Sequence, residues 1–234
     1  MKAPAVVPFS WTGLYVGVNA GYSWGPWDAS SNQQVFNFES RTASPKVNGW
    51  LGGIQAGYNF QSGRFVYGLE GDIQITGEKD SQDWSDPGAV VVGAGIGDFI
   101  TGAPGGGPIA IHNEWKFPWF GTVRGRLGYT PAERWLLYVT GGLAFGEAKY
   151  NFTFSQPGAG LAYALSSSET RAGWTVGAGL ETAIDNNWSV KVEYLYVDLG
   201  TRSIDTADVF GDPFHVEFKV RDHVARVGLN YKFH

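Results

Sequence analysis

The feature that most constrains this chain is a long alternation of apolar and polar residues over residues 115–146, WKFPWFGTVRGRLGYTPAERWLLYVTGGLAFG. It predicts two long strands joined by one tight turn at residues 130–133. A period of two places alternate residues on opposite faces of a strand. In the first strand one face is apolar (Trp115, Phe117, Trp119, Val123, Leu127 and Tyr129) and the other is largely polar (Lys116, Thr122, Arg124 and Arg126). The length of this pattern and its recurrence along the chain favour an apolar face that lies outside, against lipid.

Composition narrows how such a chain crosses a bilayer. No run approaches the roughly 20 apolar residues that a membrane helix needs. Only a helix or a closed sheet satisfies the backbone hydrogen bonds in lipid, so a membrane protein with this sequence has to be a barrel. The chain has no cysteine, which excludes disulfides and thiolate metal sites. Its net charge of −5 argues against nucleic acid as a partner.

The alternation predicts eight strands whose connections are long and short in turn. The predicted short turns are residues 61–63, 130–133 and 185–187, and the predicted loops are residues 25–46, 80–112, 151–168 and 203–214. Bacterial transmembrane barrels combine tight periplasmic turns with longer extracellular loops. We therefore expect an all-β, eight-stranded antiparallel up-and-down transmembrane barrel over residues 11–234, preceded by a periplasmic leader at 1–10. An even strand number places both termini in the periplasm.

Two further observations bear on this expectation. The start, MKAPAVVPFS, lacks the apolar core of a signal peptide, so we expect a mature form with an added or retained Met1. The water-soluble alternative is a lipocalin-like barrel, which would hide its apolar face and expose its charges. Here the charges share a face with glycine instead, which favours the membrane.

Aromatic residues gather at the ends of the predicted outward faces, as interfacial girdles do. They are Trp11, Trp24, Trp50, Tyr58, Phe60, Phe65, Trp115, Tyr129, Trp135, Trp188, Tyr231 and Phe233.

The predicted inward face carries charges of both signs at similar heights in the barrel. They are Glu70, Asp72, Arg124, Arg126, Glu181, Lys191, Glu193 and Arg226, four acidic and four basic. The lumen of an eight-stranded barrel is just wide enough for side chains to fill it, and a buried charge costs several kcal/mol unless it is paired. We expect one network of paired charges that plugs the lumen; a gate or selectivity constriction is the alternative. Ion pairing also explains the carboxylates better than acid–base catalysis does.

No constellation points to a catalytic or metal site. His215 and His223 lie on one predicted strand about 27 Å apart, at about 3.4 Å per residue, so they cannot share a metal. His112 and His215 are the candidates for binding a ligand in the loops. The rim residues Ser203, Asp205, Asp208, Asp212 and His215 lack a diagnostic spacing. We expect no enzyme activity, no metal and no cofactor.

The glycine-rich segment Gly88–Pro108 is superficially similar to a phosphate loop. It lacks G-x-x-x-x-G-K and the strand and helix that flank that motif. We expect an extracellular loop whose Val90–Val92 and Phe99–Ile100 contact lipopolysaccharide, a neighbouring barrel or a hydrophobic ligand.

Several segments together resemble the small porin-family outer-membrane barrels of alphaproteobacteria, the outer membrane immunogenic protein family. They are WTGLYVGVNAGYSWG at 11–25, WFGTVRGRLGY at 119–129, LLYVTGGLAFG at 136–146, GWTVGAGLE at 173–181 and NWSVKVEYLYVDLG at 187–200. The resemblance implies an abundant surface-exposed barrel similar in architecture to the OmpA transmembrane domain. The end YKFH is similar to the family's terminal aromatic signal for the barrel-assembly machinery, here Tyr231 and Phe233, with His234 following.

The resemblance also implies roles that some relatives have. Some bind haem, for which His112 and His215 are the histidines available here; some are weak porins; and some are joined to peptidoglycan through the N-terminus, here near Ala3.

The leading hypothesis is a structural barrel of the cell outer membrane that contributes to envelope integrity and has a plugged lumen. A small-solute porin and a surface-loop binder of haem or lipopolysaccharide are the alternatives. The expected partners are outer-membrane lipid and lipopolysaccharide, the barrel-assembly machinery, further copies or other envelope proteins, and peptidoglycan through the N-terminus.

Overall fold

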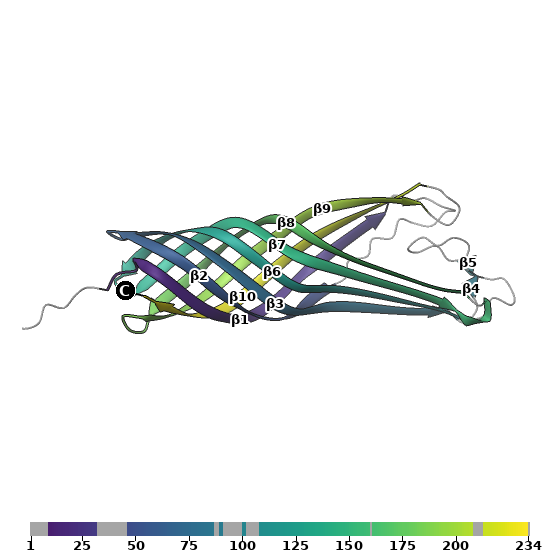
Figure 1. Cartoon of the computed structure of the whole chain (residues 1–234), viewed down its shortest axis with the longest axis horizontal. Helices are drawn as coiled ribbons and strands as arrows, with labels where there is room; N and C mark the ends of the chain where they lie inside the picture. The colour runs from purple at the N-terminus through teal and green to yellow at the C-terminus, as the bar shows by residue number, and fades with distance from the viewer. Residues whose placement is uncertain are drawn as a thin grey trace, which may run out of the picture.

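The computed structural model describes residues 9–31, 46–86, 89–90, 100–101, 108–159, 161–207 and 213–233. Its strands are β1 (Gly13–Ser31), β2 (Lys46–Ser62), β3 (Phe65–Asp86), β4 (Ala89–Val90), β5 (Ile100–Thr101), β6 (Ile109–Ala132), β7 (Trp135–Gln156), β8 (Leu161–Ala183), β9 (Trp188–Ala207) and β10 (Pro213–Lys232). Eight of them close into a barrel in the order β1-β10-β9-β8-β7-β6-β3-β2, and β4 pairs with β5 separately (Figure 1). In the described part of the chain, no helix is long and apolar enough to cross a bilayer.

The barrel is up-and-down, because each strand pairs antiparallel with its neighbours around the ring. The first strand closes on the last, from the pair Tyr15 and Lys232 to the pair Ser31 and Val216. Closure removes the free edges that an open sheet would expose to lipid. The predicted eight-stranded antiparallel barrel is confirmed.

The short turns and the last strand's end lie at the same end of the barrel, which we call the turn end (Figure 1, left). Backbone hydrogen bonds hold the end of β10 there. The Phe233 amide donates to the Leu14 carbonyl at 2.8 Å, and the Lys232 amide donates to the carbonyl of the turn residue Asn187 at 2.7 Å.

At the opposite end the strands are longer than the sequence predicted. The predicted loop at 151–168 is wrong, because β7 continues to Gln156 and β8 begins at Leu161, with a 3-10 turn at Pro157–Ala159. The ladder between these two strands extends to the pair Gln156 and Leu161. The other predicted loops are also partly strand, because β1, β3, β6, β9 and β10 continue into them. The parts of these loops that lie outside the described residues are 32–45, 87–88, 91–99, 102–107 and 208–212.

The apolar faces point outward, as predicted, over most of the barrel. The exposed fractions of Trp50, Leu69, Ile75 and Leu143 are 76%, 68%, 75% and 67%. A water-soluble barrel would bury such residues. Among the predicted girdle residues, Trp24, Trp50, Tyr58, Phe60, Phe65, Tyr129, Trp135, Trp188 and Phe233 are exposed on the outer wall.

Three aromatic residues predicted to face outward are instead inside. Trp115 and Phe117 are 7% and 1% exposed. The register of β6 shifts against β7 between Lys116 and Trp119, and the shift includes Pro118, which has no amide hydrogen to contribute to the ladder. One extra residue there reverses which side chains face the lumen. Trp11, 3% exposed, precedes β1 and lies inside the turn end.

The outward apolar band has the height of a bilayer core. On β3 it runs from Phe65 to Ile75, which is about 34 Å of strand at about 3.4 Å per residue. A strand tilt of about 40–45° reduces this to about 25 Å along the barrel axis, the height typical of outer-membrane barrels. The molecule is therefore a transmembrane β-barrel with lipid-facing apolar walls.

Candidate functional site

The candidate site is the interior of the barrel, where inward glycines make room for large side chains. A Cβ atom on Gly57 would collide with the phenol of Tyr15, and one on Gly179 would collide with the ring of Tyr138. The glycine-rich inner faces therefore leave space for these two tyrosines to reach across the lumen.

Arg124 on β6 contacts three carboxylates at once. Its Nη2 lies 2.5 Å from Glu70 Oε1 and 2.8 Å from Asp72 Oδ2, and its Nη1 lies 3.1 Å from Glu193 Oε1. All four side chains have no solvent-exposed surface. Glu193 belongs to β9, which is not adjacent to β6, so this guanidinium joins strands across the lumen.

Two more cations complete the centre of the network. Arg226 on β10 lies 2.9 Å from Asp72 Oδ2 and 2.5 Å from Glu193 Oε2. Lys191 Nζ on β9 donates to both oxygens of Glu70, at 2.8 and 2.9 Å. Each carboxylate thus faces more than one cation, which offsets the cost of burying these charges.

Arg126 connects the remaining acid to two tyrosines. Its Nη2 lies 2.7 Å from Glu181 Oε2, and its Nη1 donates to the Tyr15 hydroxyl at 2.7 Å. Its guanidinium carbon lies 4.0 Å from the centre of the Tyr138 ring, within cation–π range. The Tyr15 hydroxyl in turn donates to Glu70 Oε2 at 2.7 Å.

Neutral side chains that the sequence reasoning did not select extend the network. Ser189 and Asn230 donate to Glu181 Oε1 at 2.6 and 2.8 Å, and Thr122 donates to Asp72 Oδ2 at 2.8 Å. These residues occupy inward positions, so the period of two was a usable signal. The structure brings all eight predicted lumen charges together into one buried cluster of four acids and four bases.

Apolar clusters lie on both sides of the charge cluster. On the side away from the turn end is the outer apolar cluster: Val47, Leu51, Trp115, Phe117, Phe120, Ala144, Leu195, Val197, Leu199, Val220 and Val224. Phe117 and Phe120 stack in it with ring centres 5.8 Å apart. The reversed facing of Trp115 and Phe117 therefore fills the lumen beyond the charges.

The turn-end cluster closes the other side. It consists of Trp11, Val66, Leu136, Tyr138 and Ala183, with Phe9 packed against it. Trp11 meets Phe9 edge to face at 5.0 Å, and its amide donates to Gln61 Oε1 at 2.7 Å. The Lys232 ammonium lies 4.3 Å from the centre of the Phe9 ring. The described end of the predicted leader thus folds across the mouth of the barrel; residues 1–8 lie outside the described part.

A second group of buried acids lies nearer the outer end. Glu78 and Asp222 are each 3% exposed, and the Ser23 hydroxyl donates to Glu78 Oε1. Sequence reasoning missed this group, although Glu78 follows the same alternation as the inward Asp72 and Asp222 the same alternation as the inward Arg226, so the period of two could have found it.

The structure does not bring the predicted histidines together. His112 is exposed on β6, with Nδ1 2.6 Å from Asp83 Oδ1 on β3. His215 pairs through its backbone with Asp205, and β7, β8 and β9 separate its strand from that of His112. Among the described residues, no group of three or more His, Cys, Asp or Glu side chains is arranged so that it could hold a metal ion.

Other predicted positions are placed only in part. Tyr231 packs between Trp188 and Phe233, with ring centres 5.1 Å from each, at the turn end. Asp208, Asp212, His234 and most of Gly88–Pro108 lie outside the described residues, as do the side chains of Ser203 and Asp205.

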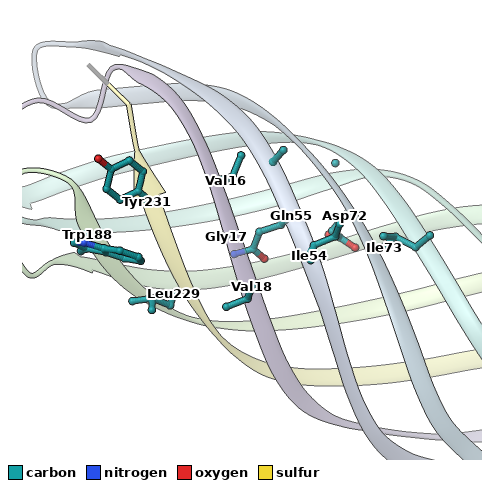
Figure 2. Close-up of a pocket in the computed structure, with 12 residues that line it drawn as sticks. Val16, Gly17, Val18, Ile54, Gln55, Asp72, Ile73, Trp188, Leu229 and Tyr231 are labelled. Carbon is teal, nitrogen blue, oxygen red and sulfur yellow. The ribbon is translucent and has the colours of Figure 1, made fainter.

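The outer wall has a hollow of about 670 Å³ over β1, β2, β3 and β10 (Figure 2). Val16, Val18, Ile54, Ile73 and Leu229 line it, and the small residues Ala56 and Gly71 leave the space. It lies within the lipid-facing band, with Trp188 and Tyr231 toward the turn end. It is therefore a depression in the membrane contact surface.

Comparisons with known proteins place this barrel in a family. Residues 2–233 match the family described as outer membrane protein beta-barrel domain. The 31 kDa outer-membrane immunogenic protein of Brucella melitensis is 43% identical, over 99% of this chain and 89% of that protein. The 22 kDa outer membrane protein of Rhizobium leguminosarum bv. viciae is 31% identical, over 87% of this chain and 72% of that protein.

Among solved structures, the outer membrane protein OprG from Pseudomonas aeruginosa has a similar fold, with a TM-score of 0.51 and 12% identity over 95% of this chain and 97% of that one. The expected resemblance to outer-membrane immunogenic proteins is confirmed. From its fold, its lipid-facing walls and these relatives, the chain is an outer-membrane protein that belongs to the outer membrane protein beta-barrel domain family.

Proposed function

We propose that this chain is a structural barrel of the outer membrane, contributing to envelope integrity, with a lumen closed to solutes. The observation that carries the proposal is the filling of the lumen by three successive layers. These are the turn-end cluster, the charge cluster and the outer apolar cluster. Arg124 and Lys191 at the centre have fully buried side chains.

Apolar layers oppose ion passage in a different way from the charges. An ion that entered from either end would have to shed its water beside Trp11 or Phe117 before it reached the charge cluster. The charges are themselves engaged by partners of the opposite sign, so they offer little net attraction. A permanent pore would require side chains from all three layers to move.

Single-channel recording in planar bilayers tests the closed lumen. The purified, refolded full chain is expected to insert without producing stable conductance steps, with insertion verified by the heat-dependent migration typical of folded barrels. Swelling of liposomes in small sugars, expected to be absent, is a second measurement. Reproducible openings of the wild-type protein would overturn the proposal and favour the small-solute porin.

The proposal includes an orientation, with the turn end and both termini in the periplasm and the strand extensions outside the cell. Short periplasmic turns are the rule for outer-membrane barrels. At the turn end, Tyr231 and Phe233 provide the terminal aromatic residues for the barrel-assembly machinery. Peptidoglycan contact through the N-terminus and lateral packing with other barrels are compatible with this orientation.

We assign no catalytic role to the chain. The relatives bear the names of outer-membrane proteins. A haem-binding role would depend on His112, which is engaged by Asp83, or on His215, whose side chain lies outside the described part of the chain. The closed structural barrel has broader support, because it uses contacts from every strand of the ring.

A further inference from the structure

A row of three lysines crosses the outer face of the barrel. In the strand register, Lys79 on β3 lies opposite Lys116 on β6, and Lys116 lies opposite Lys149 on β7. Directly opposed residues on one face have Cβ atoms about 4.5–5.5 Å apart. The three ammonium groups therefore belong to one small patch, although they are far apart in the sequence.

The residues beside these lysines show that the row faces outward. Glu78 and Trp115 immediately precede Lys79 and Lys116, and both are buried inside the barrel, with exposed fractions of 3% and 7%. Because side chains alternate along a strand, the two lysines point to the other side. The Lys116 side chain is 41% exposed.

Lys149 faces the same way. Ala148 and Tyr150, its neighbours on β7, pack against the outer apolar cluster. The Lys149 side chain is 42% exposed.

The row lies just beyond the lipid-facing band. On β3 the band ends at Ile75, which is 75% exposed, and Lys79 follows about 14 Å further along the strand, or about 10 Å along the barrel axis. On β6 and β7 the next pair toward the membrane is Trp119 and Glu147, where Trp119 Nε1 donates to Glu147 Oε2 at 3.1 Å. The lysine row therefore lies at the height of lipid head groups, and the lysine stems are long enough to reach back toward them.

Nearby acids compensate the row only in part. Lys116 Nζ lies 2.8 Å from Glu114 Oε2, and Lys149 Nζ lies 3.4 Å from Glu147 Oε1. Within the described part of the chain, no carboxylate is within ion-pair distance of Lys79. Three lysines against two carboxylates leave the patch positive, on a chain whose net charge is −5.

The two carboxylates remain ionised at neutral pH. Hydrogen bonds from Lys116 and Asn151 lower the pKa of Glu114 from its ordinary value. The Ser168 hydroxyl, with Lys149, lowers the pKa of Glu147. The patch is thus a mixed site with an excess positive charge, and like charges directly opposite each other are destabilising without a counter-ion.

We propose that Lys79, Lys116 and Lys149 bind a phosphate group of a phosphorylated glycolipid in the outer leaflet, the lipid A portion of lipopolysaccharide. Lysine is a suitable phosphate ligand because it acts as a mobile point charge. A phosphate at this height leaves the attached acyl chains beside the lipid-facing wall, continuous with the membrane contact surface. The inference rests on the proposed orientation, which places this end of the barrel at the outer leaflet.

Titration in detergent micelles tests the site with the refolded full chain. Native mass spectrometry counts bound molecules of bis-phosphorylated lipid A, with dephosphorylated lipid A and inorganic phosphate as separate probes. At low ionic strength each lysine near a phosphate contributes about 1 kcal/mol, or about fivefold in affinity. The triple variant Lys79→Gln, Lys116→Gln, Lys149→Gln is therefore expected to bind bis-phosphorylated lipid A about 100-fold more weakly, and added salt should reduce the wild-type affinity.

Two control proteins separate charge from fold. Replacing all three lysines by arginine keeps the charges and should retain most of the binding. Lys219→Gln removes a cation on β10, opposite Asp28 and Thr201 and away from the row, and should leave binding unchanged. Heat-dependent migration verifies that each variant is folded.

Equal binding of the glutamine variant and the wild type would overturn the site. Equal binding of dephosphorylated lipid A would overturn phosphate recognition, and displacement of lipid A by stoichiometric inorganic phosphate would overturn the choice of a lipid ligand. The micelle assay requires neither orientation nor a closed lumen, so its failure is distinguishable from a failure of the conductance test.

Discussion

Arg124 illustrates how a single side chain connects the interior. It contacts carboxylates of β3 and β9 and has no exposed surface. Its removal would leave three buried acids with fewer cations and a void in the centre of the lumen. Removing one partner of a buried ion pair costs more than the pair itself contributes, because the remaining charge is left uncompensated.

Arg124→Ala is expected to lower the free energy of unfolding by about 3–5 kcal/mol. Urea unfolding in micelles, followed by tryptophan fluorescence, measures it. Arg64→Ala is the matched control, because Arg64 is exposed at the turn end and donates to the Tyr129 hydroxyl at 3.2 Å. A surface substitution of this kind is expected to change the free energy of unfolding by no more than about 0.5 kcal/mol. An unchanged midpoint for Arg124→Ala would contradict a stabilising charge cluster.

At the scale of elements, the segment before β1 acts as part of the core. Trp11 is 3% exposed and contacts Phe9. The side-chain oxygen of Gln61, near the end of β2, accepts the Trp11 amide hydrogen, and the Gln61 backbone amide donates to the Thr12 hydroxyl at 2.9 Å. The segment therefore joins the start of β1 to the end of β2, 50 residues later. It closes the turn end by packing rather than by charge.

Trp11→Ala is expected to lower the free energy of unfolding by about 3–5 kcal/mol, as for other buried tryptophans. Trp50→Ala is the matched control, since Trp50 is 76% exposed on the lipid-facing wall, where lipid or detergent replaces the lost contacts. The same urea titration compares the two. Similar losses for both variants would argue against a packed turn-end cluster.

At the scale of the whole molecule, the barrel is asymmetric. The turn end has compact connections, whereas β3, β6, β7 and β8 continue well beyond the lipid-facing band at the other end (Figure 1). The proposed function assigns the first end to the periplasm and the second to the cell exterior.

Labelling of single cysteines in intact cells tests this orientation, because the chain contains no native cysteine. A membrane-impermeant maleimide is expected to modify the Thr153→Cys variant, on the exposed extension of β7, and to leave the Ser62→Cys variant at the turn end unmodified. Both should react once the outer membrane is permeabilised. The reverse labelling pattern would show that the barrel is inserted the other way.

Much of this architecture could be predicted from local geometry. The alternation of side chains along a strand depends only on the backbone, so the strand number, the apolar outer wall and the inward facing of Arg124 and Glu193 were readable without any long-range information. The presence of both signs on the inner face similarly indicated that the charges would compensate each other.

What the sequence determined by itself was therefore which residues of a regular strand share a face, and hence the solvent on each side of the barrel. Only the tertiary structure decided where that rule is interrupted and which residues meet. The register shift beside Pro118, which turns Trp115 and Phe117 inward, depends on how β6 pairs with β7. The contact of Lys191 with Glu70, 121 residues apart, and the opposition of the three surface lysines depend on the closure and register of the ring. The face on which a side chain lies is a local property of the backbone. Which side chains meet across the lumen or along a row is set by strand pairing, which a period of two does not encode.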